Sequence, residues 1–312
     1  MPELIPAEPG SPEWLAARRQ GVTATDIGTI VGLSTRKSVY SLFWNKLDQV
    51  PDDPDNDRWR VGHHMEPYVA ERWEEQALPE LADRLIDGAL YRHSERAWQM
   101  ATLDRLAAGE PVELKSWADA DRKRWEDGPP AVVRAQVLWQ MDVMDVATGH
   151  VGVVFLPSGE FRSYTIEHPC PDERVELPEV ECLICDDILL MRDAGAEFMA
   201  RLRLELPPPD PDSSAATLAA VRARFARQPG KQAEIDPVPY WNWVNAKLQV
   251  TAAEAKVLDA EIRLREQAGE ATVYTIEAEP VARRIVSDAK VRAHTRHVDY
   301  LRRITPKGDD DA

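Results

Sequence analysis

Three side chains that could do metal chemistry gather in residues 101–115, ATLDRLAAGEPVELK. The segment reads as two short strands joined by a tight turn at 107–110, with Asp104 near the end of the first strand. Alternate residues of a strand face the same side, so Glu113 and Lys115 emerge together and the hairpin brings Asp104 beside them. Two carboxylates and an ammonium on one sheet face are costly unless a cation joins them, and hard oxygen ligands suit Mg²⁺ or Mn²⁺. The alternative from these residues alone is a surface hairpin of alternating charge.

Two predicted helices contribute polar side chains that could reach this hairpin. The segment 129–146 reads as a strong helix on which Gln136 and Gln140 lie one turn apart and share a face. Beside an acidic metal site such a face can hold a water or a phosphate, whereas elsewhere these would be ordinary surface glutamines. A second helix begins at about Gly62 and carries Glu66, with Tyr68, Val69 and Trp73 directed to the core. His63 and His64 on this helix point apart, so we interpret them as phosphate or surface groups.

The N-terminal segment has the features of a phosphate cradle. Residues 11–20 read as a helix capped by Ser11, and Gly21 ends it. Thr25 or Asp26 can cap the next helix, and Arg19 lies just upstream. A helix N-terminus with a hydroxyl and a nearby guanidinium suits an anion. An ordinary capped helix explains the same residues, and both interpretations remain open.

Composition excludes several classes of protein. The chain has 312 residues and 44% hydrophobic content, enough for a sizeable core. It contains no run of apolar residues long enough to cross a membrane and no N-terminal signal segment, and its three cysteines argue for a reducing cytoplasm. We interpret Cys182 and Cys185, a C-x-x-C in an apolar helical stretch, as buried thiols.

The charge is unevenly distributed. The net charge is −16, but basic residues flank the candidate hairpin and recur in segment 281–307. An acidic body with a basic groove would limit nonspecific adhesion while leaving a track for a polyanion. Ordinary solvated faces would give the same pattern, and the sequence does not separate these alternatives.

The remaining segments indicate a mixed α/β core followed by an accessory region. Strands are expected at 89–93, 97–103 and 112–117 and in a hairpin over 149–168, and residues 172–205 read as mostly helical. The proline-rich segment 206–214 reads as a linker. Region 215–312 is expected to hold a short helix, a long helix over about 241–267, a β-hairpin and a final basic helix. It could contact DNA, a partner protein or a neighbouring subunit, or pack as an ordinary accessory region.

The order of these pieces resembles a known nuclease family. W-x3-R-R-Q-G-V-T-A-T-D, then G-H-H-M-E-P, A-T-L-D-R-L, E-L-K and A-Q-V-L-W-Q-M follow one another as in the YqaJ / lambda exonuclease family, within the PD-(D/E)XK nucleases. The resemblance covers roughly residues 12–200. It implies a mixed sheet flanked by helices, a restriction-endonuclease-like core at 1–205, and a C-terminal extension.

The resemblance also implies roles for individual residues. Asp104, Glu113 and the backbone carbonyl of Leu114 would bind Mg²⁺, which Mn²⁺ may replace, and Glu66 would serve a second ion. Lys115 would position or activate water, and Gln136 matches the family's glutamine after E-x-K. The further residues are the expected 5′-phosphate pair Arg19 and Thr25 and the possible DNA contacts Arg18, Gln140, Lys123 and Arg124.

Some positions depart from the family pattern. Leu103 replaces the usual proline, and Thr25 stands where many relatives have serine. Val132 and Val133 occupy the place of a frequent aromatic residue, and Leu138 replaces a second common glutamine. These changes leave the metal site intact but alter the contacts expected around the phosphate.

The implied activity is Mg²⁺-dependent 5′→3′ digestion of double-stranded DNA in the cytoplasm. It would leave 3′ single-stranded tails for a single-strand annealing protein, and the resemblance implies a trimeric ring. Two other functions remain open: a PD-(D/E)XK endonuclease or nick-processing enzyme, and a non-catalytic DNA-binding protein.

Overall fold

The computed structural model describes residues 1–52, 57–76, 79–82, 84–168, 183–225, 228, 232–291 and 294–303. The chain folds as two compact units, Met1–Arg227 and Gln228–Ala312. Within the described residues, no helix is both long and apolar enough to cross a membrane.

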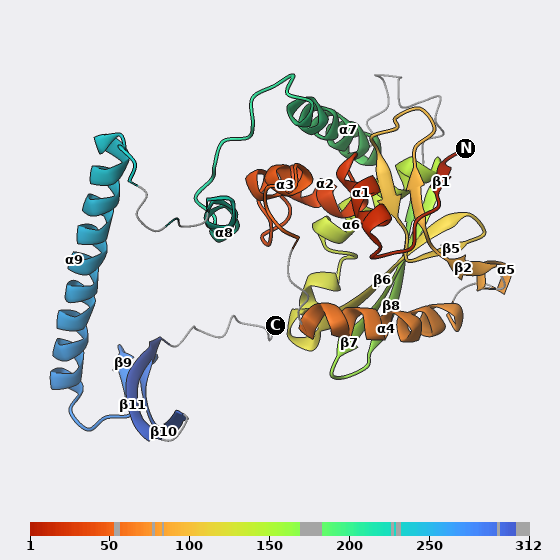
Figure 1. The fold of residues 1–312 in the computed structure, drawn as a ribbon. Helices are drawn as coiled ribbons and strands as arrows, with labels where there is room; N and C mark the ends of the chain where they lie inside the picture. Colours follow the sequence, from red (N-terminus) through yellow and green to blue (C-terminus); the bar gives the residue numbers. More distant parts are fainter. Residues whose placement is uncertain are drawn as a thin grey trace. The chain divides into compact units, whose positions relative to one another are not determined.

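A five-stranded mixed sheet forms the centre of the first unit (Figure 1). Its order is β2-β5-β6-β7-β8, and only β6 and β7 run parallel. A parallel neighbour requires a crossover connection, which contains helix α6 (Ala131–Met144). The strands are β2 (Leu85–Asp87), β5 (Arg105–Ala107), β6 (Glu110–Ala118), β7 (Thr148–Leu156) and β8 (Phe161–Glu167). The expected mixed sheet flanked by helices is therefore confirmed.

The hairpin that carries the candidate residues has the predicted turn, but its first strand is shorter than predicted. The partner of β6 is β5, and the chain reverses at Ala108 and Gly109, whose φ values of 55° and 95° suit a tight hairpin turn. The predicted first strand instead ends in a separate sheet. That sheet has the order β1-β3-β4, with β1 (Glu3–Ile5), β3 (Leu90–Arg92) and β4 (Met100–Thr102). Asp104 consequently lies in the bend between two sheets.

Close backbone contact fixes this bend. The Gly88 N–H donates to the Asp104 carbonyl at 3.0 Å, and the Leu103 N–H donates to the Ala89 carbonyl at 3.0 Å. A Cβ on Gly88 would lie 2.0 Å from the Leu103 oxygen, so only glycine fits. The strand predicted over 97–103 ends here because the chain leaves one sheet for the other.

The N-terminal helices are α1 (Pro12–Arg19), α2 (Ala24–Ile30), α3 (Val39–Lys46), α4 (Asp57–Glu74) and α5 (Pro79–Ala82). Ser11 caps α1 as predicted, by accepting a hydrogen bond from the Trp14 N–H. The cap of α2 is Thr23 and not Thr25 or Asp26, because the Asp26 carboxylate, three residues on, closes a capping box with the Thr23 N–H.

Helix α4 covers one face of the sheet (Figure 1). It begins at Asp57, one turn before the predicted start, and Val69 and Trp73 are buried against the sheet. Tyr68 was expected in the core but is 40% exposed, because it lies on the opposite side of the helix from Trp73. Val112 and Leu114 of β6 point to the α4 side. The intervening Glu113 therefore faces the other side.

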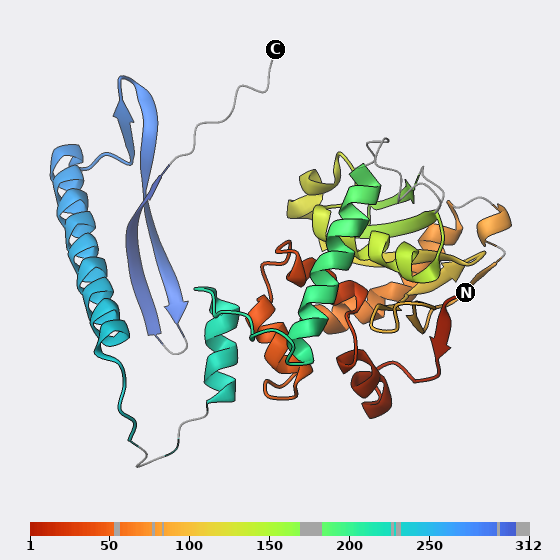
Figure 2. The ribbon, with the colours of Figure 1, turned by 90° about the horizontal axis from the view of Figure 1, so that it is seen from above.

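That other face is covered by α6, and α7 (Leu183–Leu202) packs on α6 (Figure 2). Val151, Val153 and Phe155 of β7 pack there with Trp139 of α6 in the larger apolar cluster. A 3₁₀ helix, η1 (Asp119–Trp125), follows β6. Glu113 thus enters the sheet face that α6 covers.

The first unit extends past the predicted linker. Helix α8 (Ala215–Arg224) follows segment 206–214 and packs on α3. The Thr217 hydroxyl donates to the Ser38 hydroxyl at 2.6 Å, and the Arg224 guanidinium lies 3.2 Å from the centre of the Trp44 ring. The structural division therefore falls after α8, at 227/228, and not in the proline-rich segment.

The second unit contains the long helix α9 (Pro237–Ala268) and a three-stranded sheet of order β11-β10-β9. Strands β9 (Val273–Ile276) and β10 (Glu279–Val291) form the predicted hairpin. The predicted final basic helix is wrong: residues 294–303 form strand β11, which pairs antiparallel with β10 from Val291↔His294 to Ala282↔Arg303. Alternating β-branched and aromatic residues favour a strand over a helix there.

The cysteine prediction can be followed at one position. Cys185 is buried in α7, and its Sγ lies 3.1 Å from Nε2 of His168. Cys170 and Cys182 lie outside the described residues.

Candidate active site

Asp104, Glu113 and Lys115 meet at the middle of the central sheet. The pairing Arg105↔Val112 sets Asp104 beside the start of the E-L-K segment. The Asp104 Oδ2 accepts a hydrogen bond from the Leu114 N–H at 2.8 Å, which fixes its carboxylate against β6. The structure therefore brings the three predicted side chains together.

Glu113 is the buried centre of a hydrogen-bond network. Its side chain is 2% exposed, its Oε1 accepts from Gln136 Nε2 at 2.7 Å and from the Lys115 ammonium, and its Oε2 accepts from Gln140 Nε2 at 2.6 Å. The Lys115 Nζ also donates to Gln136 Oε1 at 3.2 Å. Gln136 and Gln140 share a face of α6, as predicted.

Gln140 does not fit the DNA-contacting role that the sequence suggested. It is fully buried, and its amide donates to Glu113 and more weakly to the Thr102 carbonyl at 3.5 Å. A side chain enclosed beneath the sheet cannot reach a duplex. Gln140 instead holds one Glu113 oxygen in place, while Gln136 holds the other.

Burial and, after it, the adjacent Glu113 carboxylate together raise the pKa of Asp104 to about 8, against the opposing effect of the Lys115 ammonium. Burial alone would lower the pKa of Lys115, but the two carboxylates outweigh it and raise that pKa. Lys115 is therefore a cation at neutral pH. The two buried carboxylates repel each other, which a bound cation would relieve.

Glu66 lies close enough for its charge to act on Asp104. However, the Arg105 guanidinium binds Glu66 Oε1 at 2.7 Å and also donates to the Asp104 carbonyl at 2.6 Å. His63 is 3.9 Å from the other Glu66 oxygen. Arg105 is thus a site residue that sequence reasoning did not single out.

The donor set fits a divalent cation in part. The hard carboxylate oxygens of Asp104 and Glu113 suit one Mg²⁺ or Mn²⁺. Among the described residues, no group of three or more His, Cys, Asp or Glu side chains has the geometry of a metal site. A second ion would need Glu66, which would first have to release Arg105.

The structure pairs Thr25 with Arg18 and not with Arg19. The Arg18 guanidinium donates to the Thr25 hydroxyl at 2.9 Å and lies 4.2 Å from the centre of the Trp14 ring. Arg19, which the sequence paired with Thr25, instead contacts the carboxylates of Asp48 and Asp52, each at 3.1 Å. The reason is helical phase: Arg18 follows Trp14 by four residues and shares its face.

A buried ion pair joins α2 and α3 and contacts the backbone of Arg18. The Lys46 Nζ lies 2.6 Å from Asp26 Oδ2 and donates to the carbonyls of Arg18 and Gly21 at 2.6 and 2.7 Å. Burial alone would raise the pKa of Asp26, but the Lys46 and Arg18 cations outweigh it and hold that pKa below its ordinary value. Sequence reasoning missed Lys46, because a lysine at the end of an amphipathic helix normally lies in solvent.

The two remaining candidate DNA contacts lie at the surface. Lys123 and Arg124 are exposed on η1, directly after β6. The Arg124 guanidinium lies 6.0 Å from the centre of the Trp117 ring. Both side chains are accessible to a polyanion.

Residues 13–150 match the family model of the YqaJ-like viral recombinase domain. The Bacillus subtilis protein YqaJ is 30% identical over 118 residues, which is 37% of this chain and 36% of that protein. The match therefore spans little more than a third of this curated relative.

Two solved exonucleases are also similar. The alkaline exonuclease LHK-Exo from Laribacter hongkongensis is 19% identical, with a TM-score of 0.46, covering 62% of this chain and 94% of that one. A phage-related exonuclease from Haemophilus somnus is 12% identical, with a TM-score of 0.41, covering 59% of this chain and 96% of that one.

Proposed function

We propose that this protein is a divalent-metal-dependent nuclease acting on double-stranded DNA. The match of residues 13–150 to the YqaJ-like viral recombinase domain supports this proposal. The observation that carries the proposal is the assembled cluster of Asp104, Glu113 and Lys115 beneath Gln136 and Gln140. A merely structural hairpin has no use for a buried Glu113 with a second carboxylate and a lysine held against it. Such a cluster destabilises the fold unless hydrogen bonds and a cation compensate it, and groups with strongly shifted pKa values gather at functional sites.

Each residue of the cluster has a role in phosphodiester hydrolysis. Asp104, Glu113 and the Leu114 carbonyl would hold Mg²⁺ or Mn²⁺, which supplies charge stabilisation at the phosphate and activates water. Gln136 and Gln140 fix both oxygens of Glu113. Lys115 is held cationic by its carboxylate neighbours, so it would orient the attacking water and stabilise the charge that develops on the phosphate.

The contact between Arg18 and Thr25 supports digestion from a 5′ end. Arg18 and Thr25 lie within hydrogen-bond distance at the start of α2, and we assign the 5′-phosphate contact to this pair in place of Arg19 and Thr25. An exposed hydroxyl and a guanidinium at a helix N-terminus suit a terminal phosphate. The products would be 3′ single-stranded tails for a single-strand annealing protein in the cytoplasm.

The polarity is tested on linear duplex DNA labelled at either the 5′ or the 3′ end, with Mg²⁺ and a closed circle beside it. We expect early release of the 5′ label, late release of the 3′ label, and an intact circle. Cleavage of the circle would make the protein an endonuclease on the same fold. Binding without any metal-dependent cleavage would make it a DNA-binding protein.

The end-recognition assignment has its own test. Arg18→Gln should remove the preference for a 5′-phosphorylated end over a 5′-hydroxyl end, whereas Arg19→Gln should retain it. The opposite result would return the phosphate contact to Arg19.

A further inference from the structure

Helix α9 is long, apolar and uncovered. It runs from Pro237 to Ala268 and has no buried residue. Several of its large apolar side chains are more than half exposed, including Trp243 at 58%, Val250 at 53% and Val257 at 66%. A helix of this length with apolar side chains in water requires a partner surface.

One stripe of this helix has the spacing of a coiled-coil seam. Large residues recur every seventh position and alanines lie between them, so apolar side chains follow one another at intervals of three and four residues. The seam consists of Trp243, Ala246, Val250, Ala253, Val257, Ala260 and Leu264. It contains no polar position and spans about 30 Å of helix at about 1.5 Å per residue.

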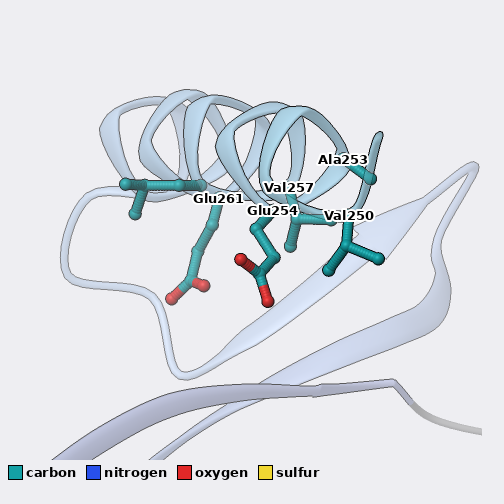
Figure 3. A pocket seen from close by; sticks show the side chains of 6 residues that line it. Val250, Ala253, Glu254, Val257 and Glu261 are labelled. Atoms are coloured by element: carbon teal, nitrogen blue, oxygen red, sulfur yellow. The ribbon is translucent and has the colours of Figure 1, made fainter. Parts of the chain in front are cut away.

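Figure 3 shows the middle of this seam. Val250, Ala253 and Val257 line a groove along one side of α9, together with Glu254 and Glu261. Leu258 completes the lining of that groove. In Figure 3 these side chains point towards strands of the same unit, but Val250 and Val257 keep exposed fractions of 53% and 66%, so the strands do not cover them.

The charges beside the seam indicate what covers it. The positions that flank one edge are Gln249, Lys256 and Arg263, and those that flank the other include Glu254 and Glu261. In a parallel pair of helices, a residue on the first edge meets the residue five places later on the partner's second edge. Gln249 of one helix would then meet Glu254 of the other, and Lys256 would meet Glu261. Each of these contacts would occur twice in a symmetric pair.

Other arrangements lack this complementarity. Antiparallel pairing along the same seam would set Lys256 and Arg263 of one helix against the same cations of the other. A second apolar stripe lies elsewhere on α9 and is interrupted by Thr251 and Arg265; parallel pairing along it would set Glu254 against Asp259. That second stripe consists of Trp241, Val244, Leu248, Ala255, Leu258 and Ile262.

We propose that α9 pairs in parallel and in register with the α9 of a second copy of this chain, along the seam from Trp243 to Leu264. Valine at two of the four large positions, Val250 and Val257, favours a two-stranded coiled coil, and alanine between them allows close approach of the helices. The surface lies outside residues 13–150 and does not depend on the nuclease proposal. It would hold two nuclease units on one stem.

The register is tested by disulfide capture in the full chain. Ala253→Cys places a thiol in the seam, where the two copies would face each other; Ala252→Cys places it about 100° around α9, outside the seam. Under mild oxidation we expect a covalent dimer on non-reducing gels from Ala253→Cys, beyond the level given by the natural cysteines. Equal yields from both variants, or no dimer from either, would overturn the proposal and leave the hairpin of the same chain to cover the seam.

Charge exchange provides a second test that leaves the apolar seam intact. In the Ala253→Cys background, Lys256→Glu should lower the yield of covalent dimer several-fold, and adding Glu261→Lys should restore it. Helix content measured by circular dichroism checks that each variant is folded. A yield of covalent dimer that changes with neither substitution would contradict the parallel register.

Discussion

At the scale of single residues, the site depends on how Glu113 is held. Three donors converge on its two oxygens, and two of them come from glutamines one turn apart on α6. Neutral amides can orient a carboxylate without cancelling its charge, which a metal ligand needs. Gln140 is therefore a positioning residue, separated from any substrate by Glu113 itself.

Removing the Gln140 amide should weaken metal binding. Gln140→Leu keeps the apolar bulk but leaves Glu113 Oε2 without its donor, and lost partners of metal ligands typically cost about 10- to 100-fold in affinity or activity. We expect the Mg²⁺ concentration for half-maximal DNA cleavage to rise by about this factor. Gln76→Leu, at an exposed position after α4, is the matched control and should leave the value unchanged. An unaltered metal requirement in Gln140→Leu would contradict the positioning role.

The raised pKa of Asp104 predicts a pH-dependent stability. The group titrates near 8 in the folded protein and near 3.8 when unfolded, so the folded state binds more protons between these values. Without metal, the free energy of unfolding should fall as the pH rises from about 4 to about 8. Denaturant titration across this range checks it, with Asp104→Asn expected to flatten the slope. A slope identical in Asp104→Asn would show that Asp104 ionises normally.

At the scale of elements, two buried junctions position the site. The Asp26–Lys46 pair joins α2 to α3 and ties down the end of α1. Gly149 lets α6 approach β7, because a Cβ there would lie 2.7 Å from Val137 Cγ1 and 2.9 Å from Met141 Cγ. The first junction holds the elements that carry Arg18 and Thr25. The second sets the position of the helix that carries Gln136 and Gln140.

Breaking the first junction should destabilise the unit strongly. Lys46→Met leaves the buried Asp26 carboxylate without its cation, which typically costs about 3–5 kcal/mol. Thermal unfolding should reveal the loss, and Lys123→Met at an exposed position of η1 is the comparison. A change in melting temperature no greater than that of the comparison would mean that Asp26 tolerates the loss.

Crowding the second junction should affect both stability and catalysis. Gly149→Ala forces α6 away from β7, and overpacking of this kind costs about 1–3 kcal/mol. Because Gln136 and Gln140 move with α6, DNA cleavage should fall as well. Gly62→Ala on α4 has open space around it and should be neutral or stabilising. Full DNA cleavage by Gly149→Ala would show that the candidate site does not depend on the close contact between α6 and β7.

At the scale of the whole molecule, the candidate site and the proposed seam fall in different units. The candidate site lies wholly within Met1–Arg227, and the seam lies wholly within Gln228–Ala312. A chain ending at Arg227 should therefore cleave short duplexes at a rate close to that of the full chain. Loss of cleavage in a folded 1–227 fragment would show that the second unit contributes to catalysis.

Much of the site could be predicted from the sequence, since strand alternation places Glu113 with Lys115 and helical spacing places Gln136 with Gln140. The errors arose where tertiary contacts overrule local pattern. The chain leaves one sheet for the other at the close contact with Gly88, so the first strand of the hairpin is shorter than predicted. Helical phase places Arg18, and not Arg19, in contact with Thr25. Arg105 and Lys46 could not be found, because a buried cation is visible only once its carboxylate partner is placed.

The most direct test of the central claim measures Mg²⁺-dependent release of nucleotides from 5′-phosphorylated linear duplex DNA by the natural chain and by Glu113→Gln. Glu167→Gln, an exposed glutamate at the end of β8, is the control. We predict cleavage by the natural chain and by the control, and loss of at least about 1,000-fold in Glu113→Gln, about 4 kcal/mol of barrier. Comparable rates in all three proteins would contradict a nuclease site built around Glu113.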